Sequence, residues 1–249
     1  MNPEYASLFA KYDTTVFERG LNDLQICLSE TQKEQFLLFY EHLTEKNKVM
    51  NLTAITAFED VVIRHFLDSL TLVKILDPGE NQNLIDLGTG AGFPGIPLKI
   101  IFPELKIVLA DSLNKRVKFL KEETENLGLK KVTAVHARAE ELGKDENYRE
   151  AFDICVSRAV ADLSVLSEYC LPLVRVGGFF VSYKSADSGE EIKRAERAIR
   201  ILGGKIQEIK TFKLPETEIG RSLIKIRKIK KTPAAYPRKA GVPGKIPLK

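Results

Sequence analysis

Apolar residues in the first eighty positions recur at the spacing of amphipathic helices. The two apolar stripes comprise Phe36, Leu37, Phe39, Tyr40 and Leu43, and then Val61, Val62, Phe66, Leu67, Leu70 and Val73. Thr31 and Glu34 have the spacing of a capping box and predict where the first helix begins. Asp77-Pro78-Gly79 ends the second stripe. The pattern predicts an N-terminal helical extension over residues 1–79.

From residue 83 onward, short apolar runs alternate with amphipathic segments. Strands are predicted at 83–87, 106–110, 132–137, 152–157, 178–184, 205–211 and 221–229, and helices near 94–102, 114–127, 140, 161–174 and 188–202. This alternation implies right-handed crossovers and a parallel sheet with helices on both faces. The last two strands are only about nine residues apart, too close for a crossover helix, so we expect them to pair antiparallel.

The predicted architecture is α/β, with a mostly parallel seven-stranded sheet and an antiparallel last strand. It resembles the Rossmann-like fold of class I S-adenosylmethionine-dependent methyltransferases. We expect a methyltransferase domain over residues 80–231, after the helical extension. Residues 232–249 form a basic tail with too much Pro and Gly for regular structure.

Composition narrows the class of protein. The 249 residues are 44% apolar, enough for one main domain. No apolar run approaches the roughly 20 residues of a membrane span, and the N-terminus does not resemble a signal peptide, so we expect a soluble, cytoplasmic protein. Three scattered cysteines predict buried free thiols, and the spacing of the three histidines predicts no metal site.

The charge is distributed unevenly. The chain carries a net charge of +4, yet residues 221–249 hold ten Lys and Arg and no acid, which leaves 28 basic and 34 acidic residues before them. Such a block is typical of a solvated, mobile end, and also of segments that bind nucleic acid.

A glycine-rich turn follows the first predicted strand, in the stretch from Leu84 to Pro97. Glycines at 88, 90, 92 and 95 can expose backbone amides to a ligand, and the last three match a dinucleotide fingerprint. Asp86 beside open amides suits the amino group of a methionine-type ligand, whereas a pyrophosphate gains nothing from a carboxylate. Pro94 also removes an amide that a phosphate would use. We therefore favour S-adenosylmethionine over a dinucleotide.

The ends of the next strands supply further candidates, because ligands bind beyond the carboxyl ends of parallel strands. Asp111 is placed to accept from both hydroxyls of a ribose. Ala139 and Glu140 can lie against an adenine ring and its amino group, although Glu140 is also a normal acid for a helix N-terminus. Arg158 can bind the target base or the cofactor carboxylate, or form a surface ion pair.

No motif for activating a poor nucleophile follows the fourth strand. The Pro-Pro-aromatic motif of amine methyltransferases is absent there. The Pro-Cys nucleophile of enzymes that attack pyrimidine carbon is absent too, because Cys170-Leu171-Pro172 lies in the next helix rather than at the strand end. A target atom that is already nucleophilic fits this pattern. The N7 of guanine has a lone pair and needs no base, so proximity and alignment can supply most of the catalysis.

Several motifs together resemble the RsmG family, also called glucose-inhibited division protein B. They are Asp86 to Leu98, Asp111 to Arg116, Ser157-Arg158-Ala159, Asn51-Leu52-Thr53, Arg64 to Ser69 and, in the tail, Tyr236 to Gly241. The resemblance covers about residues 30–230. It implies that S-adenosylmethionine is the methyl donor and that a single guanine of bacterial 16S rRNA, alone or in the small ribosomal subunit, is methylated at N7. It also implies cofactor contacts at Gly88, Phe93, Ala139, Glu140 and Arg158.

The segment Arg64-His65-x-x-Asp68-Ser69 places two residue pairs one helical turn apart, so the four side chains are predicted to form one polar edge. We expect this edge to help close the pocket over the guanine, which makes Arg158, His65 and Asp68 the catalytic candidates. An internal pair of Arg64 with Asp68 is the simpler interpretation. Lys184, at the end of the fifth strand, can bind an RNA phosphate or simply be solvated.

Three other functions remain open from the residues alone. A methyltransferase of the same fold could act on a small molecule or a protein, which would suit the acidic body. A nicotinamide enzyme would use the fingerprint, and an RNA-binding module could use the fold only as a scaffold. Salt dependence, cofactor titration and a Gly88→Asp variant would separate these possibilities.

Overall fold

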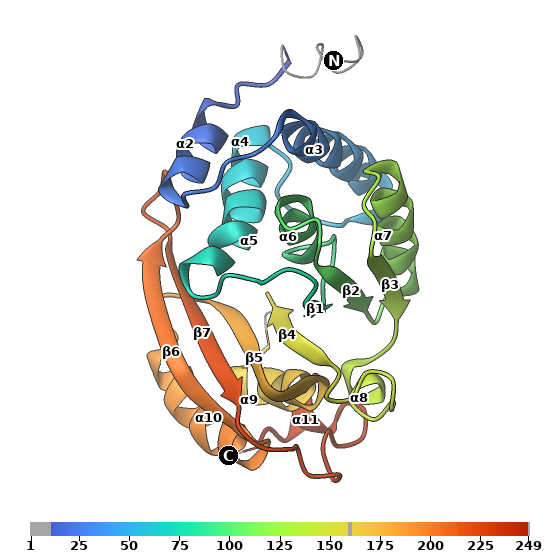
Figure 1. The fold of residues 1–249 in the computed structure, drawn as a ribbon, viewed down its shortest axis with the longest axis vertical. Helices are drawn as coiled ribbons and strands as arrows, with labels where there is room; N and C mark the ends of the chain where they lie inside the picture. The colour runs from blue at the N-terminus through green and yellow to red at the C-terminus, as the bar shows by residue number, and fades with distance from the viewer. Residues whose placement is uncertain (1–10, 159–160, 249) are drawn as a thin grey trace.

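A computed structural model describes residues 11–158 and 161–248, and it contains the predicted seven-stranded sheet (Figure 1). The strands are β1 (Asn83–Leu87), β2 (Lys106–Asp111), β3 (Val132–His136), β4 (Phe152–Ser157), β5 (Val174–Ser185), β6 (Gly204–Lys213) and β7 (Gly220–Lys228). Their order is β3-β2-β1-β4-β5-β7-β6. The first five strands pair in parallel and β7 pairs antiparallel with both neighbours, which confirms the predicted α/β architecture and its antiparallel last strand.

Both faces of the sheet are buried under helices, because the strands are apolar on both sides. Leu84 of β1 belongs to one hydrophobic cluster and Ile85 to another. The first cluster lies under α6 (Gly95–Ile101) and α7 (Asn114–Asn126). The second lies under α8 (Ala139–Leu142), α9 (Leu163–Cys170), η3 (Leu171–Leu173) and α10 (Gly189–Ile201). Near-continuous apolar strands are typical of such two-sided burial.

The N-terminal helices share the first cluster with the sheet rather than forming a core of their own. They are α2 (Thr15–Asp23), α3 (Glu30–Met50), α4 (Phe58–Val61), η1 (Val62–Leu67), α5 (Asp68–Leu70) and η2 (Thr71–Lys74). The ring of Phe66 packs 5.0 Å from Phe36, and Phe39 packs 5.2 Å from Phe93 of the glycine-rich turn. The two predicted apolar stripes therefore join this extension to the first face of the sheet.

The start of α3 differs from the prediction. Ser29 is the N-cap: its hydroxyl accepts from the backbone N–H of Gln32, and the Gln32 side chain accepts from the backbone N–H of Ser29. The capping box predicted from Thr31 and Glu34 is wrong by two residues. Both sets have the same spacing, but α3 begins at Glu30, directly after Ser29, so Thr31 already lies inside the helix.

The second stripe is not one regular α-helix. Residues 62–67 form a π-helical turn, flanked by short α-helical turns and followed by a 3-10 turn. A π-helix closes its hydrogen bonds five residues apart, so side chains four residues apart no longer stand directly above one another. The turn contains Arg64 and His65.

The basic tail is ordered against the sheet domain over the part described, to residue 248. It includes a short helix, α11 (Val242–Lys245), so the prediction that it lacks regular structure is wrong. Arg149 donates to the backbone carbonyl oxygens of Thr232 and Tyr236, each at 2.8 Å. These contacts, rather than local helix or strand propensity, hold a segment rich in Pro and Gly.

Two smaller findings concern composition. Cys155 and Cys170 are buried free thiols as predicted, but Cys27 is exposed, so that part of the prediction is wrong. It follows α2, in a connection that leaves its side chain open to solvent.

None of the described helices is long and apolar enough to cross a membrane.

Candidate active site

The four glycines of the turn after β1 divide into two pairs. Gly88 and Gly90 have φ angles of +74° and +62°, and a Cβ at either position would meet no atom within 4 Å. A Cβ on Gly95 would lie 2.2 Å from a methyl carbon of Leu109, and one on Gly92 would lie 2.4 Å from Ile96. The first pair leaves its backbone open for a ligand, whereas the second pair allows α6 to pack closely on the sheet.

The fully buried carboxyl group of Asp86 stabilises this turn. Its Oδ2 accepts from the hydroxyl of Thr89 at 2.6 Å and from the backbone N–H of Gly95 at 2.7 Å. Its Oδ1 is buried and has no hydrogen-bond partner in the part of the chain that the structure describes. Burial raises the pKa of Asp86 to about 7, against the opposing effect of these two hydrogen bonds. Asp86 therefore accepts both of these hydrogen bonds from residues of the turn itself.

Asp111 lies at the end of β2 and supports the same turn. Its Oδ2 accepts from the backbone N–H of Gly90 at 3.0 Å and from Arg116 at 3.4 Å. Its Oδ1 accepts from the backbone N–H of Leu113 at 2.8 Å. The carboxylate that was predicted for a ribose thus holds the open glycine in place.

The first pocket lies beyond the carboxyl ends of β1, β2, β3 and β4 and has a volume of about 310 Å³. Its lining includes Gly88, Ala139 and Glu140, three of the predicted cofactor residues. Leu87, Leu166 and the ring of Tyr169 give it an apolar wall, a combination typical of small-molecule sites. We call it the β1–β4 pocket.

The second pocket is larger, about 540 Å³, and is lined by all three catalytic candidates, His65, Asp68 and Arg158. Its charged lining residues are four basic side chains and two acids: Arg64, Arg158, Lys184, Arg221, Asp68 and Glu191. The surplus of positive charge suits a ligand that carries phosphates. The two pockets adjoin at the end of β4, where Ser157 lines the first and Arg158 the second. We call the second one the basic pocket.

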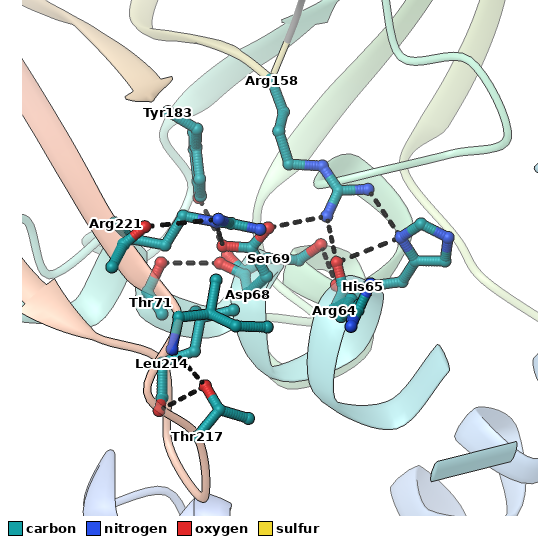
Figure 2. Close-up of polar contacts among 12 residues, drawn as sticks. Arg64, His65, Asp68, Ser69, Thr71, Arg158, Tyr183, Leu214, Thr217 and Arg221 are labelled. Carbon is teal, nitrogen blue, oxygen red and sulfur yellow. Dashed lines mark hydrogen bonds and ion pairs between the residues drawn. The ribbon is translucent and has the colours of Figure 1, made fainter. Parts of the chain in front are cut away.

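Asp68 joins two arginines from distant strands in the basic pocket (Figure 2). Its Oδ2 accepts from Arg158 of β4's end at 3.2 Å, and its Oδ1 from Arg221 of β7 at 3.1 Å. The antiparallel register of β7, which sets Arg221 opposite Ser185, brings this arginine to the carboxyl edge of β5. The Asp68 side chain is only 5% exposed, so this carboxylate is largely shielded from water. Its two cationic partners compensate for the lost hydration.

The internal pair of Arg64 with Asp68 does not form. Arg64 lies 3.2 Å from Asp60 instead, in an exposed ion pair. The widened π-helical turn between them removes the regular spacing on which the prediction relied. Arg64, His65 and Asp68 nevertheless line one pocket together, whereas Ser69 is fully buried and does not line it, so the predicted edge of four side chains forms only in part.

His65 is neutral, and its contacts determine its tautomer. Burial and the nearby charge of Arg158 lower its pKa to about 3. Because a guanidinium can only donate, the 3.2 Å contact with Arg158 makes Nδ1 an acceptor, and its 3.1 Å approach to the carbonyl oxygen of Arg64 is then not a hydrogen bond. Nε2 then carries the proton and donates to the hydroxyl oxygen of Thr53 at 2.8 Å.

Phe93 lies between the glycine turn and the basic pocket. Its ring stacks on His65, with centroids 4.5 Å apart and planes 21° apart, and the guanidinium carbon of Arg158 lies 5.1 Å from its centroid. A guanidinium so close to an aromatic face gains a cation–π attraction. Phe93 therefore orients both neighbours, while it lines neither pocket.

The predicted cofactor residues thus do not all meet in one cavity. Gly88, Ala139 and Glu140 line the β1–β4 pocket, Asp86 and Asp111 hold the turn, and Arg158 lines the basic pocket. Gly90 and Gly92 are in the turn but line neither pocket.

Arg221 and Tyr183 are among the residues of the basic pocket that sequence reasoning missed. Tyr183 donates its hydroxyl to the backbone carbonyl of Ser69 at 2.8 Å, and this bond connects β5 to α5. Because β7 runs antiparallel, its first residues lie beside the carboxyl end of β5, and looking for candidates at the start of β7 would have found Arg221. Nothing in the sequence distinguishes Tyr183 from a core tyrosine.

Lys184 is neither solvated nor free for a phosphate. Its side chain is 9% exposed and lies 2.6 Å from Glu191, and it also donates to the backbone carbonyl of Ala161. The alternative that it is solvated is wrong, because the start of α10 brings a carboxylate over the strand end. Within residues 11–158 and 161–248, no three His, Cys, Asp or Glu side chains are grouped to hold a metal ion.

Comparisons with known proteins agree with this architecture. Residues 32–220 match the family model GidB, described as rRNA small subunit methyltransferase G. The ribosomal RNA small subunit methyltransferase G of Lachnoclostridium phytofermentans is 51% identical over 95% of this chain and 98% of its own. The protein of the same name from Lactobacillus johnsonii is 49% identical over the whole of both chains.

Solved structures with low sequence identity share the fold. A putative transferase from Pyrococcus horikoshii superimposes with a TM-score of 0.52 at 12% identity, over 66% of this chain and 63% of that one. TrmN from Thermus thermophilus gives a TM-score of 0.52 at 16% identity, over 68% of this chain and 53% of its own.

Proposed function

Because the chain belongs to the GidB family of rRNA small subunit methyltransferase G, we propose that it transfers a methyl group from S-adenosylmethionine to N7 of a single guanine in bacterial 16S rRNA. The observation that carries this proposal is the pair of adjoining pockets at the end of β4, one suited to a cofactor and one to a nucleotide. Because its substrate is ribosomal RNA, we propose a cytoplasmic location for the enzyme.

The β1–β4 pocket fits the cofactor. Gly88 opens its backbone at a positive φ angle, and a side chain there would fill free space. Ala139 and the apolar wall suit an adenine ring, and the Glu140 carboxylate can accept from its amino group. Gly90, held by Asp111, would offer its open backbone to the methionine part. Asp86 and Gly92 would act indirectly, by shaping this turn.

The basic pocket fits the acceptor nucleotide. Arg158 and Arg221 keep N–H donors beyond those that they give to Asp68, and guanine O6 accepts from such groups. The three arginines of the lining, Arg64, Arg158 and Arg221, offset the charge of neighbouring phosphates. We assign Arg158 and Asp68 to guanine binding, and His65 to holding Arg158 in position. A target guanine in a loop of the RNA is easier to reach than one in a duplex.

The reaction needs alignment more than proton transfer. S-adenosylmethionine supplies a methyl group on a positively charged sulfur. The lone pair of guanine N7 forms the new N–C bond as the S–C bond breaks, and the sulfur keeps the bonding electrons. N7 carries no hydrogen, so no general base takes part, and a pKa of about 3 makes His65 a weak base. The protein contributes proximity and orientation by holding both molecules at the end of β4.

The test is to map the product. Purified protein is incubated with methyl-labelled S-adenosylmethionine and either free 16S rRNA or small subunits, and the labelled nucleotide is located. One guanine labelled at N7 is expected. Label at another atom, at many sites or on protein would refute the proposal.

A binding measurement separates RNA recognition from chemistry. RNA affinity should fall steeply as salt rises, because phosphate contacts release counterions. Cofactor affinity measured by calorimetry should change little over the same range. A salt-insensitive RNA interaction would argue against phosphate binding in the basic pocket.

A further inference from the structure

The C-terminal tail forms part of the β1–β4 pocket. Gly241 lines this pocket together with Ala139, Glu140 and Tyr169, although it is about a hundred residues away from Glu140 in the chain. Figure 1 shows the tail, in red, at the lower edge of the molecule beside α8 and α9. The cofactor pocket is thus incomplete without a segment that follows the last strand.

One contact directs the tail onto a predicted cofactor residue. The backbone N–H of Gly241 donates to Oε1 of Glu140 at 2.9 Å, and Glu140 is only 7% exposed. Gly241 has a φ angle of +79°, which favours glycine. Tyr169 of α9 lies near the same carboxylate: burial, then the charge of Glu140 and a hydrogen bond with it, raise the pKa of Tyr169. The Glu140 carboxylate is therefore held between the tail and α9.

A second contact anchors the tail three residues earlier. Arg238 donates through Nε and a terminal nitrogen to the carboxylate of Glu168 in α9, at 2.9 and 2.6 Å, and its backbone N–H donates at 2.8 Å. The Glu168 side chain is fully buried. Without Arg238 this carboxylate would lose the cation that balances it, so the docked tail is a strongly favoured state.

Part of the positive charge of residues 221–249 is therefore paired with acids inside the protein. Lys228 is fully buried and lies 3.1 Å from Glu150, and Arg238 is bound to Glu168. The sequence interpretation of this block as a nucleic-acid contact does not apply to these two residues. Between Lys228 and Arg238 in the chain, the tail is also held by Arg149, which donates to the backbone carbonyl oxygens of Thr232 and Tyr236.

From these contacts we propose that the tail acts as a wall of the cofactor pocket, with Gly241 holding Glu140 in the orientation that binds the adenine end of S-adenosylmethionine, and Arg238 as the positioning residue that anchors it. This inference rests on the proposed function for the identity of the ligand. It assigns the tail to cofactor binding rather than to RNA binding.

The experiment measures the affinities of S-adenosylmethionine, adenosine and 16S rRNA for the full chain and for variants Gly241→Ala and Arg238→Ala. Lys245→Ala, at an exposed position of α11 in the same tail, is the control. Ala keeps the backbone N–H, but it disfavours a φ angle of +79°, so Gly241→Ala should move this donor away from Glu140, and Arg238→Ala should release the tail that carries it. We expect about tenfold weaker binding of S-adenosylmethionine and of adenosine by both variants, the size of one hydrogen bond to a charged group. RNA affinity and the control should match the wild type.

Kinetics and a double variant test whether the role is one of positioning. The KM for S-adenosylmethionine should rise while the KM for RNA and the kcat stay unchanged. Combined with Glu140→Ala, Gly241→Ala should weaken cofactor binding no further than Glu140→Ala alone, because the displaced N–H of residue 241 then has no carboxylate left to orient. If Arg238→Ala does not fold, Gly241→Ala decides.

Two results would overturn the inference: unchanged cofactor affinity in Gly241→Ala, or weaker RNA binding with normal cofactor binding. Failure of the proposed function would look different. In that case the wild-type protein itself would bind no S-adenosylmethionine, or would methylate another target.

Discussion

Asp68, from the N-terminal helices, and Arg158, from the end of β4, are 90 residues apart in the chain and meet at 3.2 Å in the basic pocket. Their contact connects the helical extension to the strand end where the two pockets adjoin. Since Arg221 binds the same carboxylate, one buried acid holds two cationic side chains at the proposed acceptor site.

Asp68→Ala should impair both folding stability and methylation. The variant leaves two guanidinium groups close together without their shared carboxylate, which costs about 2 kcal/mol or more and lowers the melting temperature by roughly 4–8 °C. Methylation, measured as kcat/KM for RNA, should fall about a hundredfold, while cofactor affinity stays unchanged. Asp60→Ala is the control, because its ion pair with Arg64 is half exposed and contributes little. Normal methylation by Asp68→Ala would exclude a role in acceptor binding.

His65 should make the protein less stable in acid. Its pKa in the folded protein is about 3, below the unfolded value of 6.5, so the unfolded chain binds more protons between these pH values. The contribution of neutral His65 to the unfolding free energy is therefore fully present well above pH 6.5 and is lost as the pH falls toward 3. Relative to His65→Gln, the wild type should lose about 2 kcal/mol of unfolding free energy between pH 6.5 and 5, measured by urea titration. A constant difference between the two proteins would show that His65 titrates normally.

Asp86 should have the opposite effect on stability. Its folded pKa of about 7 lies above the usual 3.8, so the folded protein binds more protons between pH 4 and 7, and stability declines as the pH rises through this window. Asp86→Asn keeps an oxygen for Thr89 and Gly95 but cannot ionise. From pH 5.5 to 8 the variant should gain about 2 kcal/mol relative to the wild type, again by urea titration. No relative gain would mean that the Asp86 carboxyl is ionised at pH 5.5.

Gly88→Asp should prevent cofactor binding. The substitution forces a side chain into a positive φ angle and fills open space at the β1–β4 pocket. Cofactor affinity, measured by calorimetry, should fall by at least about tenfold. Gly128→Asp is the matched control, because Gly128 also has a positive φ angle, +64°, and open space around it, but lies after α7 away from the pocket. Equal affinity for both variants would place the cofactor elsewhere.

The architecture and much of the proposed cofactor pocket follow from local sequence. Apolar runs of strand length, crossover helices and a connection too short for a helix determine a parallel sheet that ends in an antiparallel strand. Strand ends then place Gly88, Ala139 and Glu140 at one edge, and the structure brings them into one pocket. These features depend on neighbouring residues and on a general rule of sheet topology, so the chain alone specifies them.

The partners of the charged groups depend on tertiary structure. Asp68 pairs with Arg158 and Arg221 rather than Arg64, because a π-helical turn alters the helix spacing and strand register delivers the arginines. The tail, which by itself favours neither helix nor strand, is fixed by Glu168 and Glu140 on distant helices. Composition and periodicity determined the sheet, but long-range ion pairs between residues far apart in the chain can be recognised only once the folded elements bring them together.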